Sequence, residues 1–151
     1  MKLIPYIHFE GNAQEALDFY KDILAAELMT ISRYEEMPAA VDHDWKNKIM
    51  HSSLKFGNNI LMISDGPMDY RSLKGNNIQL SLDVEDEAKI DELFNKLAEG
   101  GKITMPLATQ FWGAKFGMLQ DKFGIGWMLN YDIKKEETPS EPTGETLDIT
   151  V

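Results

Sequence analysis

The order of secondary-structure patterns in this chain repeats, and this repeat constrains the fold more than any other feature. A strand pattern, a helix pattern and further strand patterns run from about residue 3 to residue 65, and the same order returns over about residues 77–131. The two helix patterns also agree in length and in their place within each half. The sequence therefore predicts one α+β domain over residues 1–135, made of two similar halves.

Alternating apolar and polar side chains mark the first strand, at residues 3–10. A helix should follow from about residue 13 to residue 24, with Asn12 as its N-cap and Glu15 as the partner in a capping box. A second helix is expected over about residues 85–99. The remaining strand patterns lie at residues 27–34, 49–56 and 60–64 in the first half, and at 78–84, 102–105, 116–120 and 126–131 in the second.

The charge and composition exclude several classes of function. The formal net charge is -10, which argues against nucleic acid and anionic membranes as partners, because both require basic patches. The chain has no cysteine, so disulfides, thiolate metal sites and cysteine nucleophiles are excluded. No apolar run approaches the roughly 18–20 residues of a membrane span, and the N-terminus lacks the pattern of a signal peptide. A cytoplasmic protein is the simplest expectation.

The last residues form an acidic tail at 136–151, which begins with the composition of a linker. Beyond the linker, Leu147, Ile149 and Val151 alternate with polar residues. This alternation predicts an edge strand at 146–151, which pairs with the domain or with a neighbouring subunit.

A set of aromatic and glycine motifs resembles the PhnB-like family of the glyoxalase/bleomycin resistance/extradiol dioxygenase (vicinal oxygen chelate) superfamily. The most specific segment runs from Phe111-Trp112 through Phe116-Gly117 to an Asp-Lys-Phe-Gly turn at residues 121–124 and a last strand that contains Trp127. The start of the chain is similar to the start of sequences in that family, at Pro5-Tyr6-Ile7 and at Phe19-Tyr20. The middle of the chain is similar to the middle of those sequences, at Glu36-Met37-Pro38, His51 and Ser64-Asp65. The resemblance covers about residues 3–131.

The resemblance implies two βαβββ modules that form a curved mixed sheet around a cleft, with the helices on the outer face, in a homodimer. Some relatives carry the name of a demethylubiquinone methyltransferase. Residues 10–13 of this chain read Glu-Gly-Asn-Ala, so no glycine-rich nucleotide loop follows the first strand. We therefore expect no methyl-donor site and no cofactor.

Enzymes of the wider superfamily hold a divalent metal with His, Glu or Gln side chains from four strands, and the resemblance places these positions in this chain. The first falls at Ile4 or Pro5, and the others fall near Asn77, at Met128 and within residues 60–64. Isoleucine, proline and methionine at these places supply none of the usual ligands, asparagine is a poor ligand for transition metals, and residues 60–64 carry no carboxylate or imidazole. We therefore expect no metal site of the superfamily type in this chain.

Two histidines lie on different strands of the first half and are the candidates for catalysis. His8 belongs to the face opposite Ile7 and Phe9, and His51 shares a face with Ser53. Each histidine either satisfies a local hydrogen bond on a strand surface or lines the cleft as a general base or ligand-binding donor, because imidazole titrates near neutral pH.

Polar residues of the fifth strand are the next ligand-binding candidates. Asn77 and Gln79, with Ser81, lie on its polar side, where they face either the cleft or solvent. Trp112 and Phe116 lie around a glycine-rich bend and serve either as core residues or as a platform for a ligand.

Alternation along the last strand separates its side chains between two faces. We expect Met128 and Asn130 to face the cleft and Trp127 to face the core.

These observations support a small-molecule-binding protein with a mixed aromatic, methionine and amide lining and without the superfamily metal. The alternative is a lyase, isomerase or dioxygenase-type enzyme that uses His8 or His51 as a base or as a displaced metal ligand. A purely structural dimer is a third class, which only the analogy of fold opposes.

Overall fold

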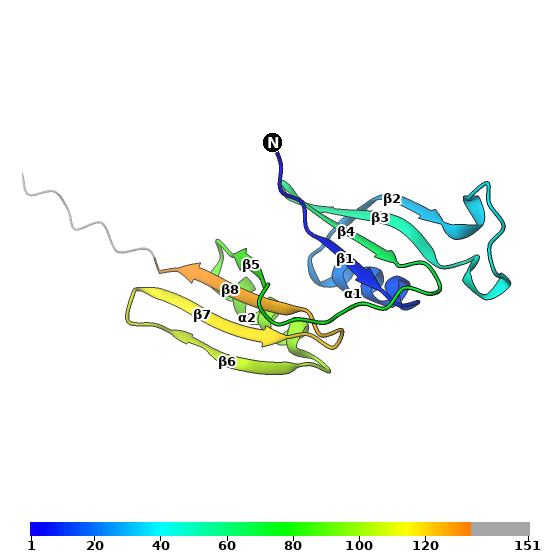
Figure 1. Cartoon of the computed structure of the whole chain (residues 1–151). Coiled ribbons are helices and arrows are strands. Elements are labelled where there is room, and N and C mark those ends of the chain that lie inside the picture. Colours follow the sequence, from blue (N-terminus) through cyan, green and yellow to red (C-terminus); the bar gives the residue numbers. More distant parts are fainter. Residues whose placement is uncertain (134–151) are drawn as a thin grey trace, which may run out of the picture.

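The computed structural model describes residues 1–133, which form two strand–helix–strand modules (Figure 1). The first module contains β1 (Tyr6–Phe9), α1 (Ala13–Ile23), β2 (Glu27–Arg33), β3 (Ile49–Phe56) and β4 (Asn59–Asp65). Two short 3-10 turns, η1 (Tyr34–Glu36) and η2 (His43–Trp45), lie between β2 and β3. The second module contains β5 (Leu80–Asp83), α2 (Glu87–Ala98), β6 (Lys102–Thr109), β7 (Ala114–Gln120) and β8 (Gly126–Asp132).

The two modules have the same sheet topology. The strand order is β1-β4-β3-β2 in the first sheet and β5-β8-β7-β6 in the second. In each sheet the first strand pairs in parallel with the last strand of its module, and the other neighbours are antiparallel. The predicted α+β fold of two βαβββ modules is confirmed. The strands form two separate four-stranded sheets, because β1 and β5 are both edge strands and do not pair with each other.

Asn12 is the N-cap residue of α1, as predicted, but an aspartate from the end of β4 holds the start of the helix. The Asn12 side chain makes no capping hydrogen bond. The backbone N–H groups of Gly11 and Ala13 instead donate to Oδ1 of Asp65 at 2.7 and 3.0 Å, and the N–H of Ile49 donates to Oδ2 at 3.0 Å. A buried carboxylate far along the chain satisfies the helix terminus, so the local capping pattern does not decide it.

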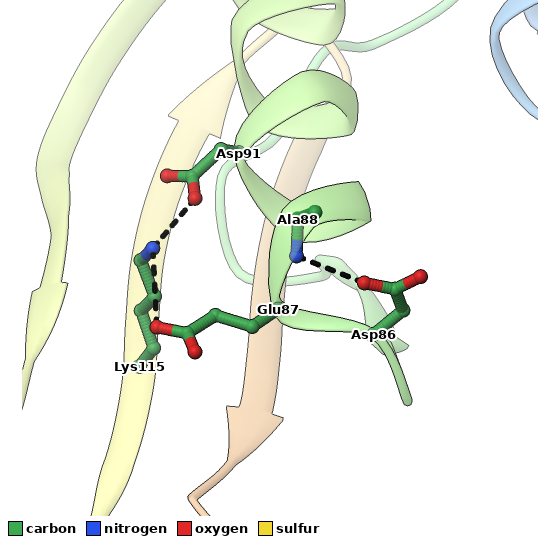
Figure 2. A network of polar contacts seen from close by, with 5 residues as sticks. All are labelled: Asp86, Glu87, Ala88, Asp91 and Lys115. Carbon is green, nitrogen blue, oxygen red and sulfur yellow. Dashed lines mark hydrogen bonds and ion pairs between the residues drawn. The ribbon is translucent and has the colours of Figure 1, made fainter.

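Polar contacts fix α2 to the second sheet, as Figure 2 shows. Oδ1 of Asp86 accepts a hydrogen bond of 2.9 Å from the N–H of Ala88, which caps the helix. Lys115 on β7 reaches across to α2 and contacts Asp91 at 2.6 Å and Glu87 at 3.8 Å. Lys115 therefore points to the helix side of the sheet, and its neighbour Phe116 points to the opposite side.

One hydrophobic core cluster includes buried residues of both modules. The turn after β7 carries Phe123, whose ring lies 5.7 Å from that of Phe9 and 5.5 Å from that of Phe19 in the first module. The ring centroids of Tyr20 in α1 and Trp127 in β8 are 5.7 Å apart. Trp127 is only 1% exposed, so the prediction that it faces the core is confirmed.

The predicted edge strand at 146–151 lies outside the described residues. Neither α1 nor α2, the two α-helices of residues 1–133, has the length and continuous apolarity needed to cross a membrane.

Candidate functional site

The side of the first sheet that faces away from α1 carries a cluster of rings, which we call the histidine cluster and define as Tyr6, His8, His51, Ser64 and Tyr70. The rings of Tyr6 and His8 are stacked at 4.7 Å with 20° between their planes. The Tyr6 hydroxyl is joined to Nδ1 of His51 by a hydrogen bond of 2.9 Å, and Nδ1 of His8 is joined to Oγ of Ser64 at 3.0 Å. Two histidines that are 43 residues apart in sequence thus belong to one cluster.

The register of the strands explains why these side chains meet. His8 on β1 lies directly beside Ser64 on β4. Because side chains alternate along a strand, Tyr6 and His8 share the face opposite buried Phe9. His51 lies on β3, two strands away from β1, and the long side chain of Tyr6 spans the intervening strand to reach it.

A cleft of about 850 Å³ lies between the two modules and has the histidine cluster on one wall. Tyr6, His8 and Tyr70 line it from the first module and the segment after β4. Gln79 and Gln120 line it from the second module. The volume falls within the range that accommodates a small organic molecule. His51 does not line this cleft and reaches it only through Tyr6.

The segment between β4 and β5 forms part of the cleft wall and is held in place at two points. Gly66 leaves room for the ring of Tyr70, since a Cβ at this position would lie 2.3 Å from it. The ring centroids of Tyr70 and His8 are in turn 5.7 Å apart. Further along, the N–H and the hydroxyl of Ser72 both donate to Oε1 of Glu10 at 2.8 Å. The backbone hydrogen bond from Ser72, more than the other contacts, lowers the pKa of Glu10.

Four of the predicted site residues gather on the second sheet instead, on the face away from α2. Phe116 lies beside Asn130 in the register, and Met128 lies on the same strand as Asn130. The Trp112 ring is 6.0 Å from the Phe116 ring. None of these four residues lines the cleft, so the structure separates them from His8 and His51.

Asn77 and Gln79, predicted to lie on the fifth strand, instead precede β5 in the segment between β4 and β5, which we call the linker. Gln79 lines the cleft together with His8. Asn77 is exposed and is absent from the cleft lining. Ser81 on β5 is exposed as well, beside Met128. The third histidine, His43, has a side chain that is 94% exposed, and its Nδ1 lies 3.4 Å from Oδ1 of the neighbouring Asp44.

The residues at the superfamily metal positions do not fit a divalent cation. Across residues 1–133, no three His, Cys, Asp or Glu side chains come together in a group that would hold a metal. The last strand carries Met128 and Asn130, and neither side chain supplies the carboxylate oxygens that hard cations prefer. The backbone N–H groups of Gly11 and Ala13 at the start of α1 already donate to the Asp65 carboxylate, so they do not bind another anion.

Sequence reasoning missed three members of the histidine cluster. The alternation of residues 3–10 already puts Tyr6 on the face of His8, so this residue had a usable signal. Ser64 and Tyr70 had none, because their places depend on the pairing of β1 with β4 and on the path of the linker.

The topology of two βαβββ modules with a cleft between them defines the class of protein. The fosfomycin resistance protein FosX from Mesorhizobium loti has this fold at a TM-score of 0.59 and 10% sequence identity, over 85% of this chain and 89% of its own. This likeness shows that the two proteins share a fold of two βαβββ modules.

The family follows from the sequence. Residues 1–130 match the family described as 3-demethylubiquinone-9 3-methyltransferase. The chain therefore belongs to this family, which is the PhnB-like branch of the vicinal oxygen chelate superfamily. The protein YjdN of Escherichia coli is 32% identical over 91% of this chain and 99% of its own length.

Two solved structures agree with this family. PA1353 from Pseudomonas aeruginosa shares 39% identity over 89% of this chain and 99% of its own, with a TM-score of 0.80. A putative 3-demethylubiquinone-9 3-methyltransferase, PhnB protein, from Bacillus cereus shares 32% identity over 87% and 99%, with a TM-score of 0.73.

Proposed function

We propose that this protein binds a small molecule in the cleft between its two modules, with His8 as the central contact. The observation that supports this most directly is the position of the His8 ring. It lines the cleft between Tyr6 and Tyr70 while its Nδ1 is hydrogen-bonded to Ser64. Ser64 is 2% exposed, so it orients the imidazole and leaves the other ring nitrogen available for a ligand.

The composition of the cleft fits binding of an organic ligand. Aromatic rings offer stacking surfaces, and the side-chain amides of Gln79 and Gln120 offer hydrogen-bond donors and acceptors. A cleft with an apolar lining and a few convergent polar groups is the usual form of such sites.

We further propose that the protein works as a homodimer. Phe111 is 97% exposed and Trp112 is 53% exposed, and their rings are in edge contact at 5.0 Å. Exposed aromatic pairs of this kind mark interaction surfaces, and a second copy of the chain is the occupant that we propose. Of the four second-sheet candidates, Trp112 then belongs to this interface, and Phe116 lies next to it, with ring centroids 6.0 Å apart. The mass in solution tests this: a dimer is expected, and a monomer at high protein concentration would contradict it.

A histidine NMR titration tests the binding proposal. The imidazole signals of ¹⁵N-labelled protein are followed while mixtures of small organic fragments are added. Signals of His8 should move with at least one mixture, and His8→Ala should weaken the binding of that mixture as measured by calorimetry. The matched control is His43→Ala, which removes an exposed imidazole far from the cleft lining. If only His43 responds, or if no histidine does, the proposal fails.

The hydrogen-bonded pairs of the cluster favour a second candidate, a metal-free lyase or isomerase. A histidine held by a hydroxyl at one ring nitrogen is the arrangement of a general base with its orienting partner. The double substitution His8→Ala with His51→Ala separates the two functions, because it would abolish turnover of a substrate in an enzyme. In a binding protein it would only weaken the affinity.

A further inference from the structure

We propose that the cleft takes a planar aromatic molecule that carries a negative charge, such as an aromatic carboxylate. This inference rests on the proposed function and names the class of ligand. It follows from the ring geometry of one wall and from the charges of the others, two features that are independent of each other.

The first feature is the run of rings along the wall. The Tyr6 and His8 rings are nearly parallel, and the centroid of the Tyr70 ring lies 5.7 Å from that of His8 with 53° between the ring planes. The exposed fractions of Tyr6 and Tyr70 are 41% and 39%, so both rings have faces or edges open to the cleft. A flat ring placed against this wall gains stacking contacts that an aliphatic ring of the same size does not.

The second feature is a local charge of opposite sign to that of the whole chain. The formal net charge is -10, but the charged side chains that line the cleft are Lys74, Lys102 and Glu10. Within residues 1–133 neither lysine forms an ion pair with an acidic side chain. Glu10 accepts both hydrogen bonds of Ser72, and the charges of Arg71 and Lys74 also lower its pKa, so the carboxylate offsets part of the charge of Lys74 and the cleft keeps one net positive charge.

The local charge outweighs the distant ones at physiological salt. Charges more than about 8 Å apart are largely screened at this ionic strength, so the acidic surface elsewhere has little effect inside the cleft. The two ammonium groups therefore attract an anionic group, while the amides of Gln79 and Gln120 supply neutral hydrogen bonds.

Three matched compounds test the inference by calorimetry or by the shift of the His8 signal. 2-Naphthoate has both the aromatic ring and the charge. 2-Naphthalenemethanol keeps the ring without the charge, and decahydro-2-naphthoate keeps the charge without aromaticity. We expect 2-naphthoate to bind at least about threefold more tightly than either analogue, as one exposed ion pair or one ring contact would provide.

Variants assign the effect to residues. Lys74→Met and Lys102→Met should each weaken 2-naphthoate binding by about threefold and leave the alcohol unaffected. Tyr70→Leu should weaken both aromatic compounds and leave the saturated acid unaffected. Lys55→Met is the control, because it removes an exposed lysine of β3 that does not line the cleft.

The outcomes distinguish this inference from the proposed function. Equal binding of the three compounds, or a response of 2-naphthoate to Lys55→Met as large as to Lys74→Met, would overturn the ligand class. If other fragments move the His8 signal while 2-naphthoate does not, the ligand class is wrong and the proposed function stands. If no compound moves it, both are wrong.

Discussion

The hydroxyl of Tyr20 in α1 donates a hydrogen bond of 2.5 Å to Oδ2 of Asp121, 101 residues further along the chain. This contact joins the helix of the first module to the turn after β7 in the second. Asp121 is 3% exposed and also accepts from the Trp127 indole at 2.9 Å and from the N–H groups of Phe123 and Ile125 at 2.9 and 3.0 Å. A single buried carboxylate thus holds together the elements that border one end of the cleft.

Asp121→Asn should destabilise the protein by about 3 kcal/mol, because an amide nitrogen would face N–H or O–H donors that the carboxylate now accepts. Urea unfolding measures this change. Asp69→Asn is the control, since Asp69 is exposed and accepts no hydrogen bond from a described residue; it should change stability by less than about 0.5 kcal/mol. Equal effects of the two substitutions would contradict the role of Asp121.

The same contact predicts how stability depends on alkaline pH. Burial, more than the nearby Asp121 charge, raises the pKa of Tyr20 far above its ordinary value. A phenol with a raised folded-state pKa contributes stability below its unfolded pKa of about 10, and this contribution declines as the pH rises above that value. The free energy of unfolding should therefore fall more steeply above pH ~10 in the native protein than in Tyr20→Phe. Parallel pH profiles of the two proteins would refute the assignment.

Asp65, and not Asn12, should determine the stability of the start of α1. Asp65→Asn leaves at least one of three backbone N–H donors without a good acceptor and should cost about 2 kcal/mol. Asn12→Ala should cost less than about 0.5 kcal/mol, because its side chain caps nothing. Thermal and urea unfolding of both variants measure this difference, and a larger loss from Asn12→Ala would reverse the conclusion.

The attachment of the linker to β1 should respond to acid. The pKa of Glu10 lies below its ordinary value because of the hydrogen bonds from Ser72, so the tether persists under mildly acidic conditions and is lost as the pH falls through that lowered pKa. In a carbon-detected titration of Glu10, Ser72→Ala removes the hydroxyl donor and keeps the backbone N–H, so it should raise the midpoint only part of the way toward the ordinary value. An unchanged midpoint would show that the Ser72 hydroxyl does not hold the carboxylate in solution.

Local patterns were enough to predict the fold, because each element has its own periodicity. The second half repeats the first, and the alternation along β8 placed Trp127 in the core and Met128 on the other face. The separation into two sheets was not predictable in this way. It depends on the absence of pairing between β1 and β5, and no local pattern reports on that pairing.

The candidate site was only partly accessible from the sequence. Alternation placed His8 and Tyr6 on one face, but the partners Ser64 and Tyr70 come from segments 56 and 62 residues beyond His8. The residues at the start of α1 show the same limit, because Asp65 replaced the capping pattern of Asn12 through a contact 52 residues away in sequence. Long-range contacts of this kind decide both the cap and the cleft.

A crystallographic fragment screen of the protein tests the central claim, that a small molecule binds between the modules beside His8. We expect fragment density in the cleft, within hydrogen-bonding distance of the free nitrogen of His8 and stacked on Tyr6 or Tyr70. Fragments that bind only elsewhere, or a cleft filled by side chains of the protein itself, would contradict it.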